Sequence, residues 1–244
     1  MDKLTGKVAV VTGSSAGIGQ AIAKRLAEEG ATVVVNYGKS ADKAKTVVAE
    51  IEAKGGKAIA VQADMSQVAD ARRLVRDTMQ RFAQLDILVN NAAISLNKAL
   101  VDTTEEEFDQ MFALNTKGPY FAMQEAAGVI SNGGRIVNIS TGGTHLGIPG
   151  ATAYLGTKAA LEQFTKGLAH ELASRRVTVN SVAPGFTDTA MLWESFRDTA
   201  AQMTPLGRLG KPRDIADVVM FLVSDDAGWL TGQTIQASGG AVMR

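Results

Sequence analysis

Tyr154 and Lys158 are the residues whose types and spacing most directly suggest chemistry. They lie four positions apart in the segment Ala153–Ala173, whose apolar residues recur at helical spacing, so both side chains are expected on one helix face. A nearby ammonium favours a phenolate and lowers the pKa of a tyrosine from about 10, which permits acid–base catalysis near neutral pH. An isolated pair of this kind is more often a surface feature, so the surrounding elements must decide.

A glycine-rich loop at residues 12–19 joins the first apolar run to a helical segment. Gly13 permits a tight turn, while Gly17 and Gly19 allow backbone N–H groups and the positive end of the helix to approach a pyrophosphate. The spacing differs from the usual G-x-G-x-x-G pattern, and glycines also mark ordinary turns. The order strand, glycine loop, helix nevertheless predicts dinucleotide binding.

The end of the second apolar run bears on which dinucleotide is bound. Folds that bind NAD usually place an acid there to accept the ribose 2′-hydroxyl, but this chain has Asn36 and Tyr37, followed by Lys39 and Ser40. The lack of an acid removes repulsion against a 2′-phosphate, which Lys39 and Ser40 are able to bind. We therefore expect a preference for NADP(H) over NAD(H), with Lys39 as an ordinary loop lysine being the other interpretation.

Composition excludes several classes of protein. The 244 residues are 45% hydrophobic and carry 25 Lys and Arg against 25 Asp and Glu, so no basic excess indicates a nucleic-acid partner. Without cysteine there is no disulfide, thiolate nucleophile or cysteine-ligated metal, and the two histidines, His145 and His170, are far apart in the sequence. No apolar run approaches the length of a membrane span. We expect a cytoplasmic protein with no metal site.

Short apolar runs alternate with helical segments along the whole chain, at residues 7–12, 32–35, 58–63, 86–91, 135–141, 177–182 and 233–236. This alternation predicts a single α/β domain, residues 1–244, with a Rossmann-type doubly wound parallel sheet of about seven strands and helices on both faces. Ligands of such sheets bind at the carboxyl ends of the strands. Gly13, Asn36, Asp64 and Asn91 all lie at such ends, and Ser140 and Thr141 supply two hydroxyls at another.

Asn115 lies in a helix that begins after Thr104. Pro119, four residues further on, has no N–H to donate to the Asn115 carbonyl, so that carbonyl is released from the helix ladder. It is then either directed into the site or part of a tolerated bend.

The segment of about 186–210 follows the sixth strand and is rich in apolar residues, including Phe186, Trp193 and Phe196. Such a segment over the strand ends is typical of a mobile substrate lid, although the same side chains are equally suited to core contacts. Together with Leu146 and Ile148 it favours an uncharged, hydrophobic substrate.

Taken together and in this order, the glycine loop, the asparagines Asn90 and Asn91, Asn115, the strand-end hydroxyls, the Tyr154/Lys158 pair and the Pro184–Gly185 turn resemble the classical short-chain dehydrogenase/reductase family over nearly the whole length. The resemblance implies that Tyr154 exchanges a proton with the substrate oxygen, that Lys158 lowers its pKa and holds the nicotinamide ribose, and that the Asn115 carbonyl anchors a water in a proton relay. It also implies cofactor contacts by Gly13, Ser15, Gly17, Ile18, Gly19, Asp64, Met65, Asn91, Ala92, Pro184, Gly185, Thr187 and Thr189.

The family commonly has a serine 13 residues before the tyrosine, and that position is Thr141, with Ser140 one residue earlier. Neighbouring strand residues point to opposite faces, so only one of the two hydroxyls is expected to reach the substrate oxygen. Register favours Thr141, and Ser140 is the alternative if the strand end is distorted.

The leading functional hypothesis is an NADP(H)-dependent carbonyl reductase or alcohol dehydrogenase acting on a small or medium ketone or secondary alcohol. A 3-oxoacyl-carrier-protein reductase is the second, and a non-catalytic nucleotide sensor is the third. The resemblance also suggests a homotetramer. The sequence does not identify the substrate, its stereochemistry or the physiological direction.

Overall fold

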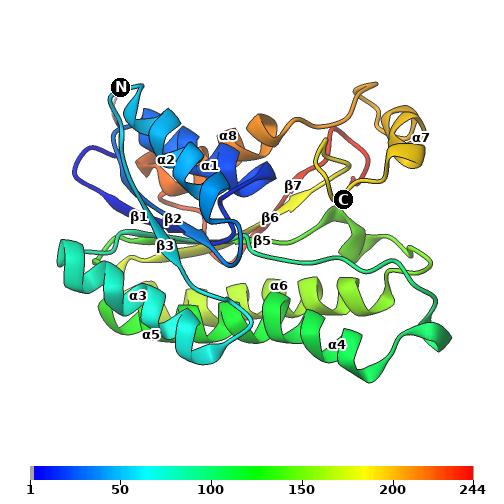
Figure 1. Ribbon diagram of the computed structural model, residues 1–244, viewed down its shortest axis with the longest axis horizontal. Coiled ribbons are helices and arrows are strands. Elements are labelled where there is room, and N and C mark those ends of the chain that lie inside the picture. The colour runs from blue at the N-terminus through cyan, green and yellow to red at the C-terminus, as the bar shows by residue number, and fades with distance from the viewer. Residues whose placement is uncertain (1–2, 244) are drawn as a thin grey trace.

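The computed structural model describes residues 3–243 and contains one seven-stranded parallel sheet (Figure 1). Its strand order is β3-β2-β1-β4-β5-β6-β7, with a reversal of winding direction between β1 and β4. This confirms the predicted doubly wound parallel sheet. The strands are β1 Val8–Val11, β2 Thr32–Tyr37, β3 Lys57–Gln62, β4 Ile87–Asn90, β5 Arg135–Ile139, β6 Thr178–Pro184 and β7 Thr234–Ala237.

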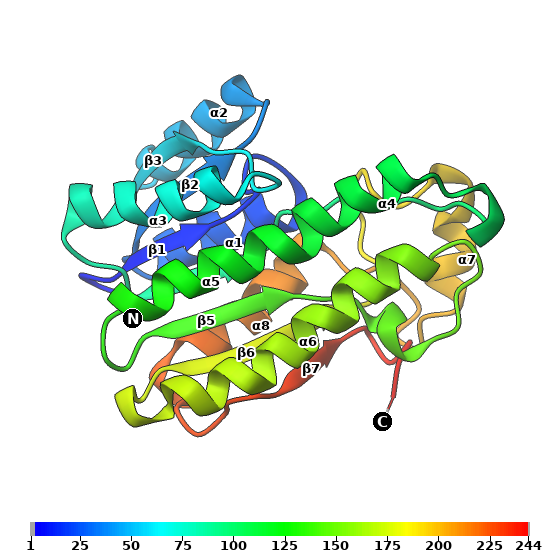
Figure 2. The same cartoon turned by 90° about the horizontal axis from the view of Figure 1, so that it is seen from below.

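Helices cover both faces of the sheet (Figure 1). One face carries α1 Gly17–Glu28, α2 Ala41–Glu52 and α8 Pro212–Val223, and the other carries α3 Val68–Phe82, α4 Glu105–Phe112, α5 Gly118–Val129 and α6 Thr152–Leu172. The short helix α7, Arg197–Gln202, lies beyond the carboxyl ends of the strands. Seen from below, α4 and α5 form one long rod beside α6 (Figure 2).

Two apolar layers explain why the sheet forms here. The central strands are buried on both faces, as their continuous runs of valine, isoleucine and leucine require. Ile22 and Leu26 of α1 pack in the layer under α1 and α8, whereas Leu74 of α3 and Ala126 of α5 pack in the other layer.

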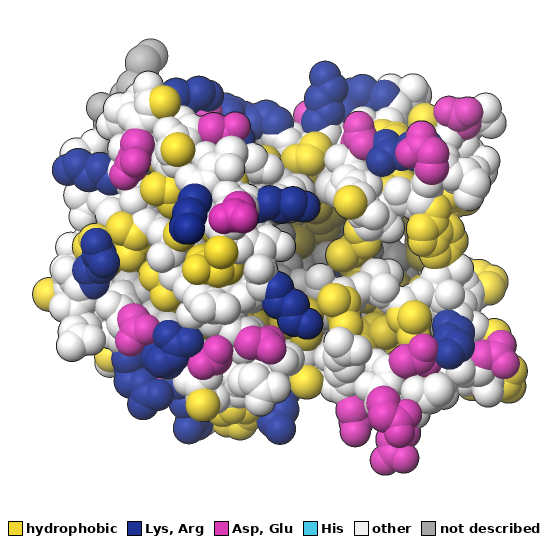
Figure 3. Space-filling view, viewed as in Figure 1, with side chains coloured by type: hydrophobic (Ala, Val, Ile, Leu, Met, Phe, Trp, Pro, Cys, Tyr) yellow, Lys and Arg dark blue, Asp and Glu magenta, His cyan; other side chains and the backbone are white. Residues whose placement is uncertain are grey.

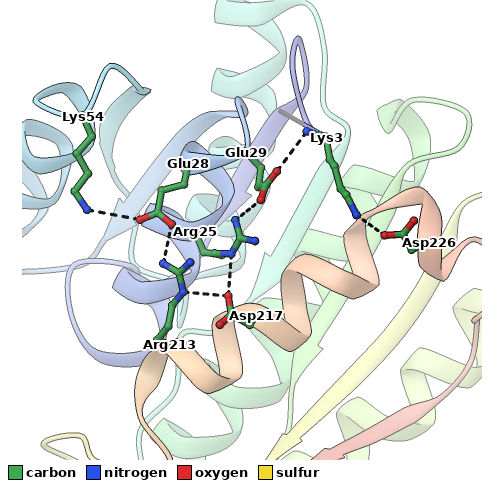
Figure 4. Close-up of polar contacts among 8 residues, drawn as sticks. All are labelled: Lys3, Arg25, Glu28, Glu29, Lys54, Arg213, Asp217 and Asp226. Atoms are coloured by element: carbon green, nitrogen blue, oxygen red, sulfur yellow. Dashed lines mark hydrogen bonds and ion pairs between the residues drawn. The ribbon is translucent and has the colours of Figure 1, made fainter. Parts of the chain in front are cut away.

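Charged side chains join α1 to α8 at the surface (Figure 4). Arg25 pairs with Glu29 at 2.6 Å and with Asp217 at 2.8 Å, while Arg213 pairs with Glu28 at 2.7 Å and with the same Asp217 at 3.0 Å. Single exposed ion pairs contribute little, but shared partners connect these into a network that holds the two helices in register.

The helix boundaries follow local signals. Thr104 caps α4 with a reciprocal pair of bonds to Glu107, as the polar residue before an acidic turn predicts. Strand β5 is shorter than expected and ends at Ile139. Ser140 N still donates to Val182 O at 2.8 Å, after which Thr141 accepts from Gly143 N at 3.2 Å and starts a tight turn. The two strand-end hydroxyls therefore lie just beyond the strand.

A hollow opens on the side where the strands end, between the part of the molecule with α7 and the part with α4 (Figure 3). Apolar side chains line part of its walls in this view. Within residues 3–243, no helix has the length and apolar character needed to cross a membrane.

Candidate active site

The glycine loop between β1 and α1 has a backbone that only glycine adopts readily. Gly13 and Gly17 have φ angles of +61° and +58°, in the left-handed region. A Cβ at Gly19 would lie 2.4 Å from Asn91 Nδ2 and 2.6 Å from Gly13 O. Helix α1 begins at Gly17 after Ala16, which has no polar side chain to cap it, so the first N–H groups remain suited to an anion.

Thr12 and Asn91 brace this loop from the neighbouring strand. The Thr12 hydroxyl accepts from the backbone N–H groups of Asn91 and Ala92, at 2.9 and 3.0 Å. Asn91 Nδ2 donates to Thr12 O at 2.9 Å and to Gly13 O at 3.1 Å. The predicted cofactor residue Asn91 therefore shapes the loop with its amide group. No role for Thr12 is predicted from the sequence, although its position directly before the first glycine of the loop could have indicated one.

The prediction that the Asn36 side chain contacts the cofactor requires a correction. Its side chain is 1% exposed, with Oδ1 accepting from Gly13 N at 3.0 Å and Nδ2 donating to Ala63 O at 3.1 Å. Both ends of the amide are used inside the protein, so Asn36 shapes the loop and cannot present its amide to a ribose phosphate. The exposed residues of this strand end are Lys39 and Ser40, after the half-buried Tyr37.

Tyr154 and Lys158 project from the first two turns of α6. Lys158 is 2% exposed, its Nζ donates to Ile139 O at 2.7 Å, and it lies 6.0 Å from the centre of the Tyr154 ring. Burial raises the pKa of Tyr154 to about 12, and burial lowers the pKa of Lys158 to about 8. The predicted lowering of the phenol pKa by Lys158 is therefore wrong for the chain on its own, because desolvation dominates.

The structure distinguishes the two candidate hydroxyls. The Thr141 hydroxyl lies close enough to the Tyr154 phenol to oppose part of the rise in its pKa. Ser140 points elsewhere, and its Oγ donates to Glu162 Oε1 at 2.6 Å. Of the two, Thr141 is placed to share a substrate oxygen with Tyr154.

Asn115 lies in a π-helical turn, Ala113–Lys117, between α4 and α5. Gly118 N donates to Ala113 O, five residues back, so the helix is distorted next to Pro119, as the proline predicts. The buried Asn115 side chain exchanges two bonds with the backbone of Ile94, at 2.9 and 2.8 Å, and also donates to Thr157 Oγ1 at 3.1 Å. It thereby fixes the segment after β4 against α6.

The other predicted cofactor residues lie around the same strand ends. Asp64 is exposed after β3 and accepts from Ser66, while Met65 is buried beneath α5. After β6, Thr187 donates to Gly185 O at 3.0 Å, and Thr189 lies 3.7 Å from where a Cβ at Gly17 would be. The remaining members of the set are Ser15 and Ile18, both partly exposed in the glycine loop, and Pro184, which ends β6.

The predicted substrate residues come from two segments, and the apolar side chains of the segment 186–210 are called the apolar lip below. Phe186 and Phe196 pack edge to face with ring centroids 5.6 Å apart, and Trp193 between them in the sequence is 52% exposed. Leu146 is exposed and Ile148 half-buried on the turn after β5. In residues 3–243, no cluster of three His, Asp or Glu side chains is arranged to hold a metal ion.

A separate cavity of about 1070 Å³ lies between α6 and β7, on the other side of the turn that carries Thr141. Neither Tyr154 nor the glycine loop lines it; its walls include Thr144, His145, Glu162, Lys166, Gln236 and Val242. The candidate active site therefore lies at Thr141, Tyr154 and Lys158, outside this cavity.

Comparisons with known proteins identify the family. A family model described as Enoyl-(Acyl carrier protein) reductase matches residues 13–242. Elsinochrome reductase 1 of Elsinoe fawcettii is 44% identical, covering 99% of this chain and 96% of its own. The 3-oxoacyl-[acyl-carrier-protein] reductase of Staphylococcus aureus is 42% identical over 97% and 98% of the two chains.

A crystal structure of the angucycline C-6 ketoreductase LanV with bound NADP has a TM-score of 0.94 and 45% identity, covering 98% of this chain and 96% of that one. These matches extend over nearly the whole length, and the chain therefore belongs to the classical short-chain dehydrogenase/reductase family.

Proposed function

We propose that the protein is an NADP(H)-dependent ketoreductase that interconverts a small or medium hydrophobic ketone and its secondary alcohol. The observation that carries this proposal is the placement of the buried Lys158 6.0 Å from the Tyr154 ring on the same helix, with the Thr141 hydroxyl beside the phenol. The glycine loop beside it fits a dinucleotide, because the absence of side chains at Gly13 and Gly19 lets the loop pack tightly against Ala92 and Asn91 with its backbone at the start of α1.

In the proposed reduction the nicotinamide cofactor, when bound, supplies a hydride to the carbonyl carbon. Tyr154 donates its phenolic proton to the carbonyl oxygen, and Thr141 donates a hydrogen bond to the same oxygen. A phenol with a raised pKa is fully protonated at neutral pH, as an acid must be. The ammonium of Lys158 then stabilises the phenolate that remains.

Cofactor preference is proposed from the loop after β2. Lys39 and Ser40 are exposed there, and Lys39 supplies a cation for a 2′-phosphate. The NADP bound in the LanV structure supports this choice for a chain 45% identical to it. Comparing kcat/KM for NADPH and NADH tests it.

A hydrophobic, uncharged ketone is proposed from the apolar lip of the segment 186–210, which we propose acts as a substrate lid. The names of two relatives, elsinochrome reductase and angucycline ketoreductase, support a ketone substrate. The test is NADPH oxidation with a panel of aryl and alkyl ketones, followed by absorbance. Failure with every ketone in the panel would reject the proposal.

A 3-oxoacyl-carrier-protein reductase is the second candidate, favoured by the family description and by the Staphylococcus aureus relative. An acidic carrier protein needs a basic surface. Residues 126–134 contain no Lys or Arg, and the Arg175 guanidinium is engaged by Ala127 O, Ile130 O and Asn132. Turnover of a 3-oxoacyl thioester against simple ketones decides between the two. A pure nucleotide sensor, the third hypothesis, needs no acid, and retained NADPH binding without any turnover would favour it.

The assembly is proposed to be a cytoplasmic homotetramer of single-domain subunits. Support comes from the rod formed by α4 and α5 beside α6 (Figure 2), where Phe108 and Tyr120 are 43% and 44% exposed although they stack on neighbouring rings. Light scattering of the purified protein measures the subunit number directly.

A further inference from the structure

Glu162 is a buried carboxylate close to the candidate active site. It lies on α6 one turn after Lys158 and two turns after Tyr154, and it is 6% exposed. Its Oε1 accepts from Ser140 Oγ at 2.6 Å and lies 2.8 Å from Thr144 Oγ1, whose one proton is shared between Glu162 and Thr141 O at 2.9 Å. One carboxylate oxygen thus holds two hydroxyls that are four residues apart in the chain.

This carboxylate has little compensation for its burial. In residues 3–243 neither lysine nor arginine forms an ion pair with it, and His145 Nε2 is 4.0 Å from Oε2. Burying a carboxylate costs free energy unless hydrogen bonds repay it, and here hydroxyl donors provide the close contacts. An apolar residue would fill the same position at a lower cost in stability, so the cost is consistent with a role in the site.

The segment held by Glu162 contains Thr141. Ser140 and Thr144 flank it, and Gly142 and Gly143 between them have no side chains to fix the turn. Thr141 Oγ1 accepts from Gly143 N at 3.2 Å inside this turn, so the direction of its hydroxyl, which lies beside the Tyr154 phenol, depends on the shape of the turn.

We propose that Glu162 is a positioning residue: through Ser140 and Thr144 it fixes the turn that aims the Thr141 hydroxyl at the oxygen shared with Tyr154. The inference rests on the proposed function in that Tyr154 is the proton donor. It adds a residue that touches neither substrate nor cofactor but sets the geometry of the groups that do.

The test compares Glu162→Ala, Glu162→Gln and the exposed control Glu171→Ala on the same helix. In Glu162→Ala the Thr141 hydroxyl should shift by about 1 Å, and a shift of that size is expected to lower kcat about 10- to 100-fold. The KM for NADPH should stay within about twofold, because Glu162 is remote from the glycine loop. Glu162→Gln retains an acceptor oxygen, so it should recover most of the lost kcat. Wild-type kcat in Glu162→Ala, or no recovery in Glu162→Gln, would overturn the proposal.

Thr144→Val provides a second test if Glu162→Ala does not fold. It removes the Thr144 hydroxyl, keeps the Glu162 carboxylate and nearly keeps the shape of the side chain. The value of kcat should therefore fall several-fold while KM for NADPH stays unchanged. An unchanged kcat overturns the proposal. If the wild type reduces no ketone, the proposed function fails, but crystal structures still test Glu162. The distance between Thr141 Oγ1 and the Tyr154 hydroxyl should then differ from that of the wild type in Glu162→Ala, or in Thr144→Val if Glu162→Ala does not fold, and an unchanged distance overturns the positioning role.

Discussion

Lys158 Nζ lies 6.0 Å from the centre of the Tyr154 ring, and both side chains are buried, which favours the neutral form of each. Burial raises the pKa of Tyr154 to about 12 and lowers that of Lys158 to about 8. Burying these two ionisable groups therefore costs stability, and the burial occurs at the site where proton transfer is proposed.

This cost makes the first prediction one of pH dependence. The folded pKa of Lys158, about 8, lies below the ordinary value of 10.5, so between these values the folded chain binds fewer protons than the unfolded chain. Its contribution to stability therefore rises as pH increases through this window. Lys158→Met should lose that rise. Between pH 7 and pH 10, the free energy of unfolding of the wild type minus that of the variant should increase by about 2 to 3 kcal/mol.

Urea titrations of the two proteins without cofactor measure this difference, and the contribution of Tyr154 cancels because both retain it. The exposed residue Lys166 on the same helix gives the control, since Lys166→Met should differ from the wild type by a constant amount. A difference between wild type and Lys158→Met that does not change with pH would show that burial does not disfavour the ammonium.

The second prediction concerns Tyr154 as the proton donor. Tyr154→Phe removes the proton and keeps the ring, so kcat for ketone reduction should fall about 100- to 10,000-fold. NADPH affinity, measured by fluorescence titration, should change by about twofold or less. Glu171→Ala, an exposed residue on the same helix as Tyr154, should leave both quantities unchanged. Reduction at the normal rate by Tyr154→Phe would remove Tyr154 from the mechanism.

The fold was predictable because its signals are local. Runs such as Val8–Val11 are apolar on both faces, and glycines and caps mark where each run ends, so strand number and type followed from periodicity. Thr141 was favoured over Ser140 by its register relative to Tyr154, and the alternation of strand residues indicated that only one of the two would reach the site, although the strand ends two residues earlier than expected.

The site features that were missed depend on packing. Asn36 was assigned to the cofactor from its place at a strand end, but its side chain points into the protein, between Gly13 and Ala63. No role was predicted for Glu162 from the sequence, and an acid in a helix is usually solvated. Its position eight residues after Tyr154, on the same buried face, was the available signal.

The third prediction tests cofactor selection at the exposed loop after β2. Lys39→Ala removes the cation proposed to bind the 2′-phosphate, so KM for NADPH should rise about tenfold while KM for NADH stays unchanged. Lys43→Ala, an exposed lysine on the first turn of α2, is the matched control and should alter neither. Steady-state kinetics with both cofactors provides the measurement, and an equal effect of Lys39→Ala on both cofactors would argue against a contact with the phosphate.

The fourth prediction uses two glycines of the same helix. A Cβ at Gly118, at the start of α5, would lie 1.8 Å from Met65 O, in the segment proposed to flank the adenine. Gly118→Ala should therefore force α5 and this segment apart, lower the free energy of unfolding by about 1 to 3 kcal/mol and weaken NADPH binding.

Gly128 near the end of α5 has open space where its Cβ would be. Gly128→Ala should accordingly raise the free energy of unfolding by about 0.5 to 1 kcal/mol through helix propensity alone, without any effect on NADPH affinity. Thermal and urea denaturation of both variants, with parallel NADPH titrations, separates the two effects. Similar behaviour of Gly118→Ala and Gly128→Ala would mean that the close approach of α5 to Met65 is not required, because the helix would then have room to accept a methyl group at Gly118.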